Sequence, residues 1–141
     1  MAANTAKITV GRLLEIRADA GYKTRADVDL LFDAIEREVG KLARGQRHVT
    51  VVDWRRCPVM APEAAERIAT RIAGTNATTD RSAALAANDS PVAVLQFVRV
   101  IREARLPDRK LFFDESELVE WLKDTLSAPE LRRLREFLRG A

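Results

Sequence analysis

The chain has 141 residues, of which 47% are hydrophobic and 32% are charged, as in ordinary globular proteins. This composition excludes an intrinsically disordered chain, and no apolar run approaches the roughly 18 residues of a transmembrane helix. The formal net charge is only +3, because 24 Lys and Arg residues are interleaved with 21 Asp and Glu residues. Charge alone therefore gives weak support for a nucleic-acid-binding protein.

The chain contains one cysteine, Cys57, which excludes an intramolecular disulfide and a cysteine-based zinc site. The first ten residues lack the basic start and apolar run of an export signal. Neither the P-loop pattern nor GxGxxG occurs. We therefore expect a cytoplasmic protein without a membrane span and without a cofactor.

The first half of the chain predicts a hairpin, a helix, a strand and a second helix. Residues 7–19 hold two short extended runs around a Gly-Arg pair, which indicates two strands or one bent strand. Residues 25–43 follow a capping-box pattern and carry apolar residues at helical spacing. Residues 48–54, HVTVVDW, predict a central strand covered on both faces. Pro62 is typical of the first turn of a helix. The apolar positions of the two helices are Val28, Leu31, Phe32, Ile35, Val39 and Leu42 in the first, and Ala65, Ile68, Ala69 and Ile72 in the second.

The second half continues the alternation of strands and helices. Residues 74–80 predict a polar loop, and 81–87 a strand that could also be helical. Residues 90–104 begin with Ser-Pro, which favours a helix despite their β-rich composition. Residues 109–114 predict the last strand, followed by two helices with N-cap patterns. The apolar face predicted for the helix at 90–104 consists of Val94, Phe97, Val98, Ile101 and Ala104. The N-cap patterns of the last two helices are Asp114 with Glu117 and Ser127 with Glu130.

This order predicts the α/β class, with packed helices on a mixed sheet of four to five strands. We expect residues 1–126 to form the domain and residues 127–141 to add a C-terminal amphipathic helix.

The pattern resembles the STAS domain of anti-sigma-factor antagonists and transporter tails, and more closely its SpoIIAA-like branch. The resemblance covers roughly residues 7–125, and its most specific part is the ending LFFDESELVEWL. It implies a STAS-like fold and a protein-binding role in bacterial signalling. The residues that match the family's ending are Phe113, Asp114, Glu115, Glu117, Trp121 and Leu122.

The family's phosphorylated serine is absent. In STAS antagonists an Asp-Ser pair opens the helix about eight residues after the position of Asp53, and here that pair is Ala61-Pro62. Proline has no hydroxyl group, so a phosphoserine switch at this position is excluded. Glu63 either stands in for phosphoserine as a fixed anion or, more simply, is an ordinary first-turn glutamate. We predict a non-enzymatic protein-binding module, with an exposed Met60 at its centre. The predicted partner-binding residues are Val59, Met60, Ala61, Pro62, Glu63 and Glu66.

Two other binding classes remain open. The last helix combines an apolar stripe of Leu131, Leu134 and Leu138 with arginines that could contact phosphate or a second copy of the chain. Packing of this stripe on the domain, or at a dimer seam, is the alternative. A lipid or small-ligand pocket is the other class, because the SpoIIAA-like branch is often grouped with lipid binders. The candidate phosphate or dimer contacts are Arg132, Arg133, Arg135 and Arg139.

Few residues suggest catalysis. His48, the only histidine, precedes a strand and is interpreted as an exposed strand start rather than a general base. Cys57 follows two arginines that could activate a thiol, although a packed residue before a turn is the simpler interpretation. Asp53 is predicted to cap its loop by accepting backbone hydrogen bonds. Trp54 and Trp121 are predicted to be packing residues.

Overall fold

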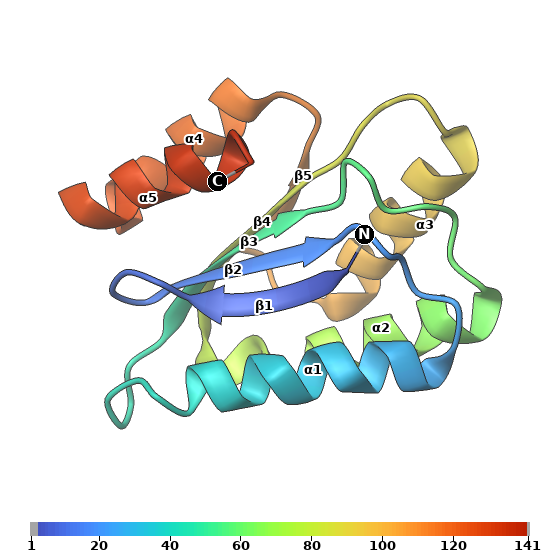
Figure 1. The fold of residues 1–141 in the computed structure, drawn as a ribbon, viewed down its shortest axis with the longest axis horizontal. Helices are drawn as coiled ribbons and strands as arrows, with labels where there is room; N and C mark the ends of the chain where they lie inside the picture. Colours follow the sequence, from blue (N-terminus) through green and yellow to red (C-terminus); the bar gives the residue numbers. More distant parts are fainter. Residues whose placement is uncertain (1–2, 141) are drawn as a thin grey trace.

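The computed structural model describes residues 3–140, which form a five-stranded mixed sheet with helices on both faces (Figure 1). β1 (Asn4–Ile8) pairs antiparallel with β2 (Leu13–Ala18). β3 (His48–Asp53), β4 (Thr79–Leu85) and β5 (Arg109–Phe112) then follow in parallel, in the order β1-β2-β3-β4-β5. The predicted α/β class and mixed sheet are confirmed.

Three helices connect consecutive parallel strands. They are α1 (Arg25–Val39), α2 (Pro62–Ala73) and α3 (Pro91–Ala104). Because such crossovers are right-handed and the strand order never reverses, all three helices cover the same face of the sheet. α4 (Glu115–Leu122) and α5 (Ala128–Leu138) cover the other face (Figure 1). Short 3-10 segments span Asn76–Thr78 and Lys123–Thr125.

The sheet separates two apolar cores, and alternate residues of β3 contribute to each. Val52 belongs to the larger core beneath α1, α2 and α3, whereas Val49 and Val51 belong to the core beneath α4 and α5. Every residue of β3 is buried. β3 is therefore the central strand covered on both faces that the sequence predicts.

The termini of the elements differ from the sequence expectations in a few places. β1 starts at Asn4 rather than residue 7, and residues 81–87 belong largely to strand β4, which starts at Thr79. α1 ends at Val39, so Leu42 lies outside it. The capping boxes at Thr24 and Ser127 are confirmed, and Ser90 and Asp114 cap α3 and α4.

The buried faces of α2 and α3 are rotated slightly from those predicted. In α2, Ala64 is buried and Ala65 only partly so. In α3, Ala93 and Val100 are buried together with the predicted Phe97 and Ala104. The predicted positions Val94, Val98 and Ile101 are half-buried.

α5 packs on the domain through its apolar stripe. Leu134, Phe137 and Leu138 are buried in the second core, and Leu131 packs partly against it. The Arg133 guanidinium also forms a salt bridge of 2.7 Å with the buried Glu15 carboxylate of β2. No helix within residues 3–140 is long and apolar enough to cross a membrane.

Candidate functional site

The loop between β3 and α2 is held tightly against α3. The Gln96 side chain of α3 accepts a hydrogen bond from the Met60 amide and donates one to the Met60 carbonyl, both at 2.8 Å. The Ala61 amide donates to the Tyr22 carbonyl at 3.3 Å. These three backbone attachments fix the direction in which each side chain of the loop points.

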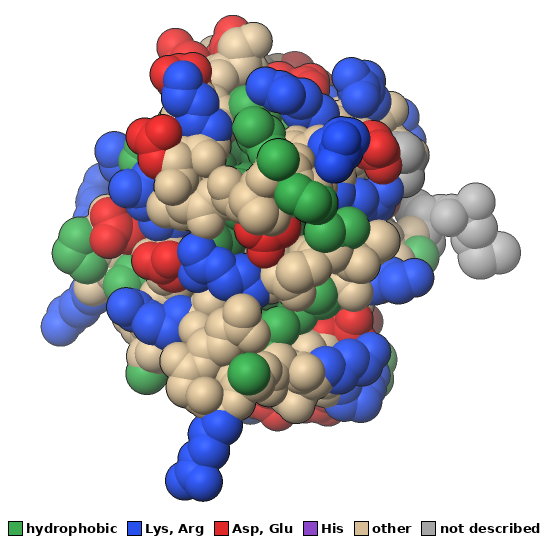
Figure 2. Space-filling model, turned by 90° about the vertical axis from the view of Figure 1, so that its left-hand side faces the viewer, with side chains coloured by type: hydrophobic (Ala, Val, Ile, Leu, Met, Phe, Trp, Pro, Cys, Tyr) green, Lys and Arg blue, Asp and Glu red, His purple; other side chains and the backbone are tan. Residues whose placement is uncertain are grey.

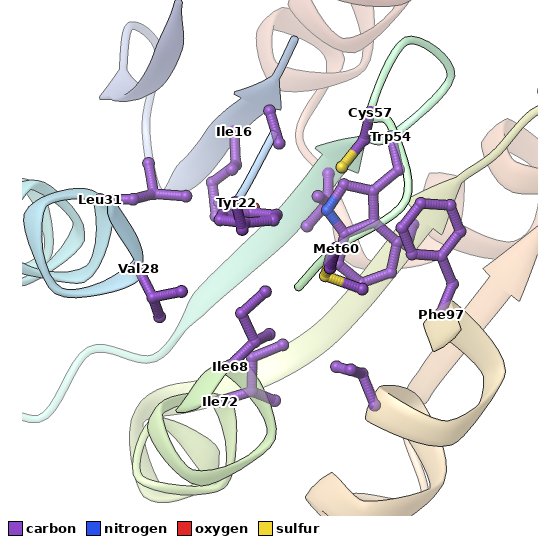
Figure 3. Close-up of a cluster of buried hydrophobic side chains, with 14 of the residues drawn as sticks. Ile16, Tyr22, Val28, Leu31, Trp54, Cys57, Met60, Ile68, Ile72 and Phe97 are labelled. Atoms are coloured by element: carbon purple, nitrogen blue, oxygen red, sulfur yellow. The ribbon is translucent and has the colours of Figure 1, made fainter. Parts of the chain in front are cut away.

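Met60 points inward. Its side chain is only 2% exposed and lies beside Trp54 in the larger core, where the Trp54 and Phe97 rings stack at 4.6 Å (Figure 3). The prediction of an exposed methionine at the centre of the docking surface is wrong. The reason is tertiary, because the Gln96 contacts turn the Met60 backbone so that the thioether fills the space under the loop.

The other predicted residues remain accessible. Val59, Pro62, Glu63 and Glu66 are exposed, and Ala61 is half-buried. Two residues of α3 are also exposed: Val92, which lies one helical turn before Gln96, and Leu95, which directly precedes it. Three of the five large hydrophobic residues with high exposure within residues 3–140 are therefore gathered here. We call this region the α2–α3 surface and define it by Val59, Pro62, Glu63, Glu66, Val92 and Leu95.

A groove of about 220 Å³ continues the α2–α3 surface along the two helices. Pro62 and Glu66 form its α2 side, and Gln96, Arg99 and Glu103 form its α3 side. Arg99 and Glu103 are paired at 2.8 Å. The start of α2 therefore supplies Glu63 and Glu66, the two carboxylates of the surface that form no salt bridge within residues 3–140.

The start of α2 has no side-chain cap. Its N-cap is Ala61, which cannot accept a hydrogen bond through its side chain, and Pro62 follows at the first helical position. Glu63 stands in the first turn, where the helix dipole favours a negative charge. Its carboxylate is exposed. This geometry fits both interpretations of Glu63 that the sequence leaves open.

Asp53 lies at the carboxyl end of β3, beneath the end of α5. Its carboxylate accepts hydrogen bonds from the Arg55 amide at 3.1 Å and from the Arg55 guanidinium at 3.0 Å. The predicted loop cap is confirmed. The Arg17 guanidinium also approaches Asp53 at 3.3 Å. Since Arg17 and Arg55 donate to the Phe137 and Leu138 carbonyls as well, Asp53 helps to dock the C-terminal end of α5.

The same groups line a polar hollow of about 500 Å³, the arginine-rich hollow. Arg56 and Arg139 are exposed on its rim. Together with Arg17 and Arg55 they outnumber the acidic lining groups, which are Asp19 and Asp53. The hollow is therefore a basic concavity at the carboxyl ends of β2 and β3.

The four C-terminal arginines are not one cluster. Arg133 forms a salt bridge with Glu15, and Arg139 lines the arginine-rich hollow. Arg132 and Arg135 are exposed on α5. Figure 2 shows one end of the molecule, where Lys and Arg side chains are interspersed with Asp and Glu rather than gathered in one continuous patch.

The two candidates for catalysis are both buried. His48 is 2% exposed, so the prediction of an exposed strand start is wrong; burial is the main cause that lowers its pKa to about 4. Burial likewise raises the pKa of the Cys57 thiol to about 12, which removes the reactive thiolate. Trp54 packs on Phe97 in the larger core, and Trp121 packs on Phe112 in the second core, which confirms that both are packing residues.

Comparisons with protein-family models, with curated proteins and with solved structures found no match to this chain. Within residues 3–140, no group of three or more His, Cys, Asp or Glu side chains has the arrangement of a metal site. Sequence reasoning missed Val92, Leu95 and Gln96. The signal was that Val92 and Leu95 are apolar yet fall outside the apolar stripe of α3.

Proposed function

We propose that the chain is a non-enzymatic protein-binding module whose partner docks on the α2–α3 surface. The observation that carries the proposal is the pair of hydrogen bonds between the Gln96 side chain and the Met60 backbone. They hold the loop that carries Val59 against α3, where Val92 and Leu95 are exposed. A preorganised apolar patch costs little conformational entropy on binding, and such patches mark interaction sites.

The chemistry of the partner follows from the rim of the patch. Glu63 and Glu66 are exposed and acidic. Of the nearby cations, Arg99 is paired with Glu103 and Arg67 with Asp29, while Arg25 shares a hollow with the two glutamates. The complementary partner segment carries apolar side chains flanked by lysine or arginine. A STAS-like regulatory role in bacterial signalling, in the cytoplasm and without a phosphoserine switch, agrees with the resemblance and with the absence of a hydroxyl group at Ala61 and Pro62.

The test is crosslinked affinity capture from native cell extract with three variants. Leu95→Asp and Glu63→Lys alter the α2–α3 surface. Leu30→Asp is the matched control, because Leu30 of α1 and Leu95 of α3 are both helical and both 69% exposed. We expect wild type and Leu30→Asp to retain the same protein, and the two surface variants to bind it at least about tenfold more weakly, or about 1.4 kcal/mol.

Equal recovery of every protein by all variants would contradict the proposal. The second candidate, nucleic-acid binding, rests on the arginine-rich hollow and the exposed Arg132 and Arg135. It predicts instead that captured nucleic acid is released by salt and lost in Arg56→Gln and Arg139→Gln. The lipid alternative has less support, because the cavity between the sheet and α1 and α2 measures only about 30 Å³.

A further inference from the structure

The interior cavity has an apolar body and one polar end. Figure 3 shows several of its apolar walls, which come from both the sheet and the helices. The polar end lies at the amino ends of β3 and β5, where His48 and Arg109 begin these strands. Thr50 and Thr75 also line it. The labelled wall residues in Figure 3 are Ile16, Tyr22, Leu31, Trp54, Ile68 and Ile72.

Arg109 is a buried cation without an anionic partner. Its side chain is 7% exposed and its guanidinium donates to three neutral oxygens: Ser82 Oγ at 3.0 Å, Asn76 Oδ1 at 3.1 Å and Thr75 Oγ1 at 3.3 Å. Among residues 3–140 no carboxylate forms a salt bridge with it. Burial lowers the pKa of Arg109 to about 10, which still leaves it charged at neutral pH. An uncompensated buried charge is costly, so an anion here would be strongly stabilising.

Two nitrogens at this polar end have no hydrogen-bond partner in the part of the chain that the structure describes. They are Nε of Arg109 and Nε2 of His48, both fully shielded from bulk solvent. The other imidazole nitrogen, Nδ1 of His48, lies 3.2 Å from the Thr50 hydroxyl. When that hydroxyl donates to Nδ1, the Nε2 atom carries the proton. Arg109 and His48 both line this cavity with an unpartnered donor, and one acceptor within reach of both would satisfy them.

We propose that this cavity is a binding site for one small inorganic anion, of the size of chloride, held by Arg109 and His48. The volume sets the size, because a cavity needs at least roughly 10–15 Å³ to hold a single water molecule and this one offers only about 30 Å³ in all. That is room for one small ion, and not for an organic phosphate. The positive charge of Arg109 selects an anion over a neutral water molecule.

The decisive experiment is a bromide soak of wild-type crystals, with the anomalous signal of bromide as the readout. A peak between Arg109 Nε and His48 Nε2 is the expected result. A cavity that contains only water, or nothing, at several hundred millimolar bromide would overturn the proposal. This measurement needs no variant, so it stands even where substitution of a buried arginine prevents folding.

Thermal unfolding in sodium chloride and in sodium gluconate of equal ionic strength gives the solution test. Gluconate is too large to enter. Chloride at about ten times its dissociation constant should raise the Tm by about 4 °C. The rise should disappear in Arg109→Gln and persist in Arg102→Gln, which removes an exposed arginine of α3. Equal Tm values of the wild type in the two salts would count against the site.

Discussion

At the scale of single residues, His48 shows how burial changes the chemistry of a side chain. Its pKa falls from 6.5 to about 4, first because of burial and then because of the positive charges of Arg109 and Arg12. The neutral imidazole is thus favoured in the folded protein, while the unfolded chain binds a proton near pH 6.5. The contribution of His48 to the free energy of unfolding is therefore fully present above pH 6.5 and is lost as the pH falls toward 4.

We expect the free energy of unfolding to drop by about 2 kcal/mol between pH 7 and pH 5 through this residue alone. Urea titrations in gluconate buffer would measure it. In His48→Gln the drop should largely vanish, since glutamine does not titrate. The carboxylates with lowered pKa values, such as Asp29 and Glu38, lose their contributions only at lower pH. An unchanged pH dependence in His48→Gln would assign the drop to other groups.

At the scale of elements, one contact ties the β1–β2 turn to the start of α5. The Glu130 carboxylate accepts hydrogen bonds from the Arg12 amide at 2.7 Å and from the Ser127 amide at 2.8 Å. It closes over Gly11, whose φ is +59°, and a Cβ added there would lie 2.3 Å from Glu130 Oε2. Gly11 therefore serves both the left-handed backbone and the close approach of α5.

Replacement of this glycine should separate the two effects. Gly45 is the control, because its φ is +80° and nothing lies within 4 Å of an added Cβ. Gly45→Ala should cost about 1 kcal/mol from its backbone alone. We expect Gly11→Ala to cost at least about 2 kcal/mol, since the Glu130 side chain must also move. Both values come from urea unfolding, and equal costs would show that the Glu130 contact contributes nothing.

The sequence predicts the helices of this fold, but not the contacts between residues that lie far apart in the chain. Capping boxes and periodicity identify the helices because they are local signals, as at Thr24 and Ser127. The burial of His48 could have been predicted in part from the sequence, because alternate residues of a strand share a face and His48 therefore lies on the same face of β3 as Thr50 and Val52. The contact of Gln96 with the Met60 backbone joins residues 36 positions apart and leaves no local pattern. For this reason the direction of Met60 could not be predicted, although the accessible neighbours around it could.

At the scale of the whole molecule, the two cores meet at the sheet, so we expect the domain to unfold as one unit. Cys57 reports on this directly because it is the only thiol and is buried beside Trp54 in the larger core. Burial also raises its pKa to about 12, so little thiolate exists in the folded state at pH 8. Modification by a thiol reagent must therefore wait for opening of the structure.

The rate of modification should then follow the population of unfolded chains. We expect negligible reaction at pH 8 in buffer and a rise of about tenfold for each 1.4 kcal/mol by which urea lowers the free energy of unfolding. Absorbance of the released chromophore gives the rate, and an unfolded sample in concentrated urea gives the reference. A fast reaction in buffer that does not depend on urea would mean that the loop carrying Cys57 opens by itself. Such local opening would also release Val59 from its fixed position and remove the preorganisation on which the α2–α3 surface depends.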